Sequence, residues 1–204
     1  MLRKHRNPLR KEPGARMKPT VFRASLILGS IGLMIAAWFV VAPMQPELAS
    51  IHKKIEAYFQ SVQHIDADGY VTLDSEQVVV FDVREPDEFA VSHLAGAIQL
   101  KPDISPEAFA RQFKDTLSGK TVVFYCSVGW RSSDLAQRVD SVLVEQGVVA
   151  SYNLTGGLFQ WHNEERPLMS EAGNSTNAIH PYNAFWGSVI DDQSAIQYSP
   201  LLSP

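Results

Sequence analysis

The stretch VVFYCSVGWRSSDLAQRV, residues 122–139, contains the only cysteine of this 204-residue chain. The run Thr121–Tyr125 is β-branched and aromatic, which is typical of a strand buried on both faces of a parallel sheet. After Arg131, apolar residues recur at helical spacing as far as Gly147, a residue type that commonly ends helices. The pattern therefore places Cys126 in a short loop between the end of a strand and the start of a helix.

This position favours a reactive thiolate at Cys126 over the inert, buried cysteine that is the commoner case. The first N–H groups of a helix lack intrahelical partners, and the helix dipole stabilises negative charge there. A cysteine at such a site has a lowered pKa and is nucleophilic near neutral pH. Gly129 allows a tight turn that converges several N–H groups, and Arg131 adds a cation suited to oxyanions. The loop thus predicts an anion-binding cradle above a sulfur nucleophile.

Three segments in this order resemble the signatures of the rhodanese family. They are FDVREPDEFAVSHLAGAIQL at 81–100, the loop that begins with Cys126, and YNLTGGLFQWHNEERPL at 152–168. The resemblance implies a single rhodanese-like domain over 64–168 with Cys126 as the catalytic residue. It also implies a substrate-binding loop of five residues, which are Ser127, Val128, Gly129, Trp130 and Arg131. We expect Trp130 to project toward the mouth of the pocket and to influence the choice of acceptor.

Asp82 and Arg84 follow a second apolar run and are interpreted as supporting residues that brace the loop. His93 and Trp161 are interpreted as structural. The remaining histidines show no metal-ligand spacing, and one cysteine cannot build a zinc site, so we expect no metal or other cofactor.

The length of the loop separates two chemistries. Four residues lie between Cys126 and Arg131, whereas the phosphatases that resemble this architecture have one more residue there and commonly a His before the Cys. By resemblance, the shorter loop favours a small anionic sulfur donor, thiosulfate or a persulfide, over phosphate or arsenate. The predicted activity is sulfur transfer through a Cys126 persulfide to a thiol or a cyanide-like acceptor.

Two other classes of protein are compatible with parts of this pattern. A non-catalytic, membrane-anchored rhodanese-like module for partner binding or redox sensing is the main alternative, because a fold does not guarantee an activity. A thiol–disulfide oxidoreductase is disfavoured, since the chain has no second cysteine.

Strand and helix patterns alternate along the domain, which predicts an α/β fold with a parallel sheet flanked by helices on both faces. The expected strands are 78–82, 97–100, 121–125 and 148–153. The expected helices are 87–90, 106–117, 132–146 and 157–162. Upstream, 43–63 is predicted to be a linker followed by an amphipathic helix, over 47–63, that packs on the domain.

The N-terminal region has the pattern of a membrane anchor. Residues 1–23 carry eight Lys or Arg and one acid, and 24–42 are 19 residues without a charge. As a helix, this segment is about 28 Å long, close to the roughly 30 Å of a bilayer core. We predict an uncleaved transmembrane signal anchor in the bacterial inner membrane, with the N-terminus cytoplasmic and the domain periplasmic. A cleaved signal peptide and a mitochondrial presequence are the alternatives.

Charge and aromatic content characterise the rest of the chain. From residue 24 onward there are 10 basic and 21 acidic residues, a net charge of −11, which argues against nucleic-acid binding. The tail, 169–204, begins with a polar stretch but continues with HPYNAFWGSVI, which is too aromatic for simple disorder. It either folds back over the domain and its pocket or binds a protein partner.

Overall fold

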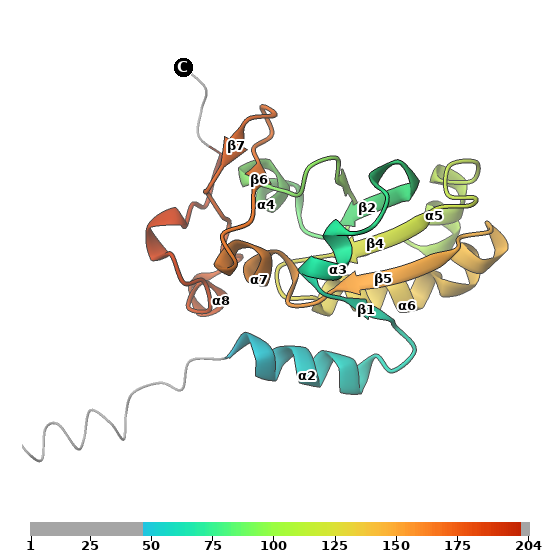
Figure 1. Cartoon of the computed structure of the whole chain (residues 1–204), viewed down its shortest axis with the longest axis horizontal. Helices are drawn as coiled ribbons and strands as arrows, with labels where there is room; N and C mark the ends of the chain where they lie inside the picture. The colour runs from blue at the N-terminus through green and yellow to red at the C-terminus, as the bar shows by residue number, and fades with distance from the viewer. Residues whose placement is uncertain (1–46, 201–204) are drawn as a thin grey trace, which may run out of the picture. The chain divides into compact units, whose positions relative to one another are not determined.

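A computed structural model describes residues 47–200 (Figure 1). The predicted leader 1–23, the predicted membrane segment 24–42 and residues 43–46 of the linker lie outside these residues. Within 47–200, every helix is too short or too polar to cross a membrane.

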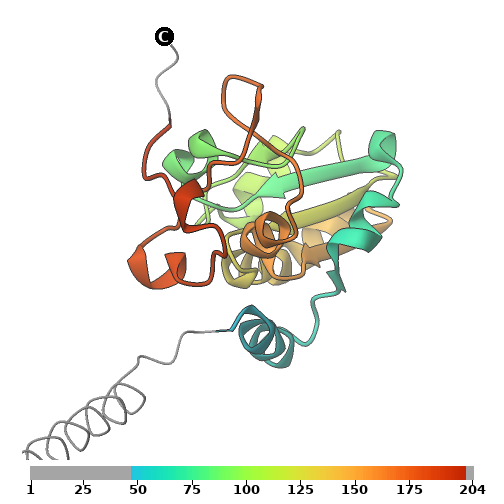
Figure 2. The same ribbon diagram turned by 60° about the vertical axis from the view of Figure 1, so that its left-hand side comes forward.

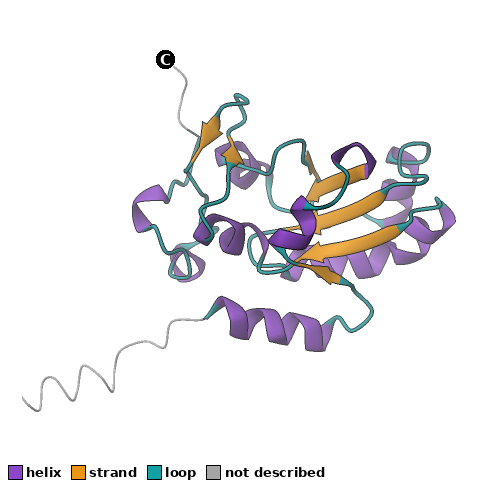
Figure 3. Ribbon diagram, viewed as in Figure 1, coloured by secondary structure: helices purple, strands orange, loops and turns teal. Residues whose placement is uncertain are grey.

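A five-stranded parallel sheet forms the centre of the fold, with strand order β1-β5-β4-β2-β3 (Figure 3). The strands are β1 (His64–Ile65), β2 (Val78–Asp82), β3 (Ile98–Gln99), β4 (Thr121–Tyr125) and β5 (Ala150–Leu154). The two strands expected at 78–82 and 121–125 are confirmed residue for residue. Asp82 pairs with Tyr125, so the carboxyl ends of β2 and β4 lie at the same edge of the sheet.

The side chains of β4 alternate between two apolar clusters. Val123 and Tyr125 belong to one cluster, whereas Val122 and Phe124 belong to the other. This alternation places one cluster on each face of the sheet. Because both faces are buried, the central strands β2 and β4 are almost wholly apolar, which is the pattern of a parallel sheet covered by helices. The predicted α/β class is therefore confirmed.

Helices precede, connect and follow these strands. They are α2 (Leu48–Tyr58), α3 (Ala67–Val71), η1 (Ser75–Gln77), α4 (Pro86–Val91), α5 (Pro106–Gln112), α6 (Trp130–Glu145), α7 (Gly157–Asn163), α8 (Ala184–Gly187) and η2 (Gln193–Ala195). The helix expected over 106–117 ends early, because the chain turns at Phe113, whose carbonyl accepts bonds from the N–H and hydroxyl of Thr116. The helix expected over 47–63 ends at Tyr58, because Phe59 turns into the core.

The tail folds back onto the domain, which is one of the two outcomes that the sequence left open. A short hairpin of β6 (Leu168–Met169) and β7 (Ser175–Thr176) begins it, and Met169 bridges to His93 after α4. Ile179 and Ile190 are buried in the same cluster as the residues of α7. Figure 2 shows this segment, in orange to red, at the end of the domain where α4 and α7 lie.

Candidate active site

Cys126 directly follows β4, is buried, and belongs to the lining of a pocket. The backbone N–H of Gly129 donates a hydrogen bond to its Sγ atom at 3.2 Å. Gly129 has φ +100°, and a Cβ atom there would lie 3.0 Å from the side-chain amide of Asn153. Only glycine accommodates both constraints easily, so the tight turn predicted for this loop is present.

Two opposing effects set the pKa of Cys126. Burial raises it, whereas the charge of Arg131 and hydrogen bonds involving Ser132 and the loop backbone lower it. The lowering effects prevail, and the pKa of the thiol lies below its usual value. The site therefore stabilises the nucleophilic thiolate, as its position at a helix N-terminus predicts.

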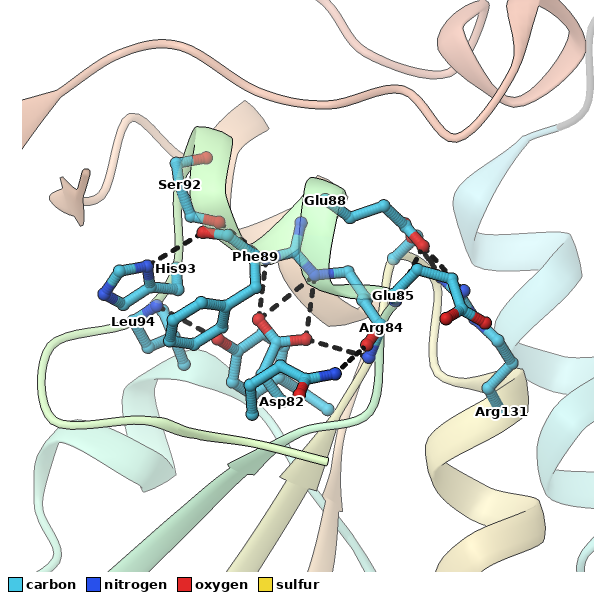
Figure 4. A network of polar contacts seen from close by, with 12 residues as sticks. Asp82, Arg84, Glu85, Glu88, Phe89, Ser92, His93, Leu94 and Arg131 are labelled. Carbon is cyan, nitrogen blue, oxygen red and sulfur yellow. Dashed lines mark hydrogen bonds and ion pairs between the residues drawn. The ribbon is translucent and has the colours of Figure 1, made fainter. Parts of the chain in front are cut away.

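Arg131 lies in the first turn of α6, and its guanidinium is paired with Glu88 of α4. Its two Nη atoms donate to the two carboxylate oxygens at 2.7 and 2.9 Å, and Ser127 donates its hydroxyl to the same carboxylate at 3.0 Å (Figure 4). Burial raises the pKa of Glu88, but hydrogen bonds and charge from Arg131 outweigh it and lower that pKa overall. Glu88 is therefore ionised at neutral pH and balances the positive charge of Arg131.

Sequence reasoning missed Glu88. The available signal was the pair Glu85 and Glu88 around Pro86, which has the spacing of a helix capping box. The structure contains that box, with the Glu85 N–H donating to the Glu88 carboxylate at 3.1 Å. The pattern locates the start of α4, but it does not reveal that the same carboxylate meets an arginine 43 residues away.

Asp82 and Arg84 are completely buried and form an ion pair, with nitrogen–oxygen distances of 2.6 to 3.1 Å. Arg84 also donates to the carbonyl oxygen of Ser92 at 2.6 Å, which ties the end of β2 to the end of α4 (Figure 4). Neither residue lines the pocket that contains Cys126. Their geometry agrees with a bracing role next to the loop, because α4 carries the Glu88 that pairs with Arg131.

The pocket above Cys126 has a volume of about 180 Å³. Its lining consists of Cys126, Ser127, Val128, Trp130, Arg131, Tyr182 and Trp186. Four of the five predicted substrate-binding residues therefore line it, while Gly129 contributes its backbone N–H to the sulfur. The last two lining residues come from the tail and were not predicted individually.

Trp130 begins α6 and lies at the edge of this pocket, as expected. Its side chain is 44% exposed and packs against two rings from the end of α2, Tyr58 at 5.1 Å and Phe59 at 5.2 Å between centroids. The amphipathic helix predicted before the domain thus contacts the edge of the site.

A buried polar chain lies behind the cysteine. Ser132 donates its hydroxyl to Asn153 at 2.6 Å, and the amide nitrogen of Asn153 lies 3.3 Å from Nδ1 of His64. His52 of α2 packs edge-on against His64, with ring centroids 5.1 Å apart. These contacts support α6 and β5 where both meet the loop, and sequence reasoning assigned them no role.

His93 and Trp161 are structural, as expected. His93 stacks on Phe89 and its Nδ1 lies 3.0 Å from the carbonyl oxygen of that residue. Trp161 is buried, and its indole N–H donates to the carbonyl oxygen of Pro167 at 3.0 Å.

Part of the chain is similar to known proteins. The rhodanese-like domain family matches residues 67–164. A sulfurtransferase from Allochromatium vinosum is 31% identical over 100 residues, which cover 49% of this chain and 86% of that protein. The thiosulfate sulfurtransferase GlpE from Coxiella burnetii is 30% identical over 103 residues, covering 50% and 87%. A rhodanese-related protein from Thermoplasma volcanium has 23% identity and a TM-score of 0.42, covering 53% of this chain and 99% of that one.

The fold and the cysteine loop define a rhodanese-like protein with sulfurtransferase homologues. This chain belongs to the rhodanese-like family. The family match includes α3 through α7, whereas α2, β1 and the tail lie outside it.

Proposed function

We propose that this protein transfers a sulfane sulfur from thiosulfate or a persulfide donor, through a persulfide on Cys126, to a thiol or cyanide-like acceptor. The observation that carries the proposal is the buried sulfur in the lining of an open pocket, with a backbone N–H at 3.2 Å and a lowered pKa. The sulfurtransferases among the relatives support the same general role.

The proposed mechanism has two displacements at sulfur. The Cys126 thiolate attacks the outer sulfur of the donor, the donor S–X bond breaks, and the leaving group departs with the electron pair. The acceptor nucleophile then attacks the outer sulfur of the persulfide and regenerates the Cys126 thiolate. Loop N–H groups stabilise the negative charge that develops on sulfur in both steps.

Intact-mass analysis of the full-length chain tests this proposal. The chain is incubated with each donor, in parallel with a Cys126→Ser variant. We expect the wild type alone to gain the mass of one sulfur atom and to lose it on addition of cyanide or a thiol. Failure of every donor to load Cys126, while the thiol still alkylates near neutral pH, would refute the proposal and favour the non-catalytic binding module.

The membrane anchor predicted over 24–42 is a separate proposal. Its support is the uncharged length of that segment and the basic residues before it. Fractionation of bacterial cells that express the full chain, followed by protease treatment of spheroplasts, tests it. Recovery of the protein in the membrane fraction with an externally cleaved domain is the expected result, and recovery in the soluble cytoplasmic fraction would refute it.

A further inference from the structure

The tail contributes two aromatic side chains to the pocket of the cysteine. Tyr182 places its ring over the guanidinium of Arg131, 5.0 Å from the ring centroid, and Trp186 of α8 lies on the same pocket lining. Both residues lie outside the segment that matches the rhodanese-like family. They therefore belong to this chain's own addition to the domain and can modify what the family loop binds.

Tyr182 is held in an unfavourable backbone conformation. Its φ is +64°, in the left-handed region that non-glycine residues seldom occupy. Its N–H donates to Nδ1 of His180 at 3.0 Å, and the next residue, Asn183, caps α8 by accepting the N–H of Trp186 at 3.0 Å. Such strain persists only where the surrounding structure maintains it, and it often marks a functional position.

The charge in the pocket is already balanced. The guanidinium of Arg131 makes two hydrogen bonds to the carboxylate of Glu88, which is only 2% exposed. A donor with two negative charges, such as thiosulfate, has to compete with that carboxylate for the same cation. The remaining lining is largely apolar, with Val128, Trp130, Tyr182 and Trp186. A pocket with a balanced charge and an apolar lining accommodates an uncharged apolar group better than an inorganic dianion.

From these contacts we infer that the pocket selects a small organic persulfide, R–S–SH with an apolar R group, over thiosulfate, and that Tyr182 and Trp186 contact the R group. This inference rests on the proposed sulfur transfer and names its donor class. The volume of about 180 Å³ limits R to a compact group.

The transfer step is balanced without any added oxidant. The Cys126 thiolate attacks the outer sulfur of R–S–SH, a new S–S bond forms on Cys126, and the S–S bond of the donor breaks. The departing R–S⁻ takes the electron pair and is protonated by water, while the proton on the transferred sulfur stays with the Cys126 persulfide. One S–S bond replaces another, so no net oxidation occurs.

Competition between two donors tests the inference. The full-length chain is treated with benzyl persulfide or with thiosulfate, and the rate constant for loading of Cys126 is followed by intact mass. We expect benzyl persulfide to load faster than thiosulfate in the wild type. Tyr182→Asn and Trp186→Ala should each lower the ratio of the two rate constants about tenfold, since each removes an aromatic contact with R. Asn is chosen at position 182 because it tolerates positive φ.

Phe185→Ala is the matched control. Phe185 precedes Trp186 in α8 and packs edge-on against its ring, with centroids 5.2 Å apart, but it is 60% exposed and does not line the pocket. Its variant should therefore keep a ratio near the wild-type value. Equal or faster loading by thiosulfate, or a ratio that is unchanged in both pocket variants, would overturn the inference and leave sulfur transfer intact. Failure of both donors to load Cys126 would overturn the proposed function as well.

Discussion

The loop 126–131 and the tail 169–200 line the same pocket but are held in place by different forces. The loop joins β4 to α6, and α7 donates backbone N–H groups to the carbonyl oxygens of Cys126 and Ser127 at 2.8 and 3.0 Å. The tail contains only short elements and is anchored by buried apolar side chains such as Ile179 and Ile190. In the proposed function, the loop supplies the reactive sulfur, and the tail supplies the side chains that we infer to contact the donor.

The largest effect is expected from Gly157→Ala, which acts on the support of the loop. A Cβ atom at Gly157, where φ is +59°, would lie 2.4 Å from the carbonyl oxygen of Cys126 and 2.8 Å from the backbone of Ser127. Backbone atoms cannot easily move away, so we expect a loss of more than about 3 kcal/mol in the free energy of unfolding. Urea denaturation followed by circular dichroism measures it.

Gly173→Ala in the tail provides the matched comparison. Gly173 has φ +78°, but a Cβ atom there meets nothing within 4 Å. Only the conformational strain remains, so the expected loss of stability is about 1 kcal/mol. Equal losses for the two variants would show that close packing of α7 does not hold the loop.

The next effect concerns the ion pair that the loop makes with α4. Glu88→Gln removes the negative charge that balances Arg131, so the cation becomes available to a dianionic donor. We expect thiosulfate loading of Cys126 to rise about tenfold relative to benzyl persulfide. Asp87→Asn makes the same charge change at an exposed position of α4, without a bond to Arg131, and should leave the ratio near the wild-type value. A similar change of the loading ratio in both variants would contradict a specific role of the Glu88–Arg131 pair and indicate an effect of net charge.

Removal of both members of the ion pair tests the electrostatics of the cysteine. In Glu88→Gln combined with Arg131→Gln, the positive charge that lowers the pKa of Cys126 is gone. We expect this pKa to rise, so that the thiolate forms only at higher pH and alkylation near neutral pH slows about tenfold. The pH profile of iodoacetamide alkylation measures it. The Glu88→Gln single variant keeps the cation, and an equal upward shift there would contradict the role of Arg131.

The smallest effect is expected behind the loop, at His64. Burial, followed by the neighbouring His52, lowers the pKa of His64 below the ordinary 6.5, and Glu56 only partly offsets this. As the pH falls below 6.5, His64 is protonated in the unfolded chain before it is protonated in the folded protein. The unfolded state is thereby favoured, and the free energy of unfolding decreases. From about pH 7 to about pH 5, the wild type should lose up to about 1 kcal/mol more than His64→Asn, given the partial exposure of the ring. Parallel losses in both proteins would contradict this assignment.

The observed ends of the strands and helices show which bounds can be predicted from local sequence patterns. The runs 78–82 and 121–125 are strands over the predicted residues, because an unbroken run of β-branched and aromatic residues is itself the pattern of a strand buried on both faces. The helix that follows Cys126 begins two residues earlier than expected, at Trp130. Gly129 is its N-cap, and the backbone carbonyl of Gly129 accepts the N–H of Ser133 without any side-chain cap. The helix expected over 106–117 ends at Gln112, where a turn at Phe113 prevails over apolar spacing.

The class of fold, the loop that contains Cys126 and the general chemistry follow from the order of amino acids alone, because apolar strand runs, helix starts and the family motifs are short-range patterns. The pairing of Glu88 with Arg131 and the position of the Tyr182 ring over the same guanidinium depend on the folded chain. These contacts join residues that are 43 and 51 positions apart in the chain. Their geometry depends on how α4 and the tail pack against α6, which no local pattern records.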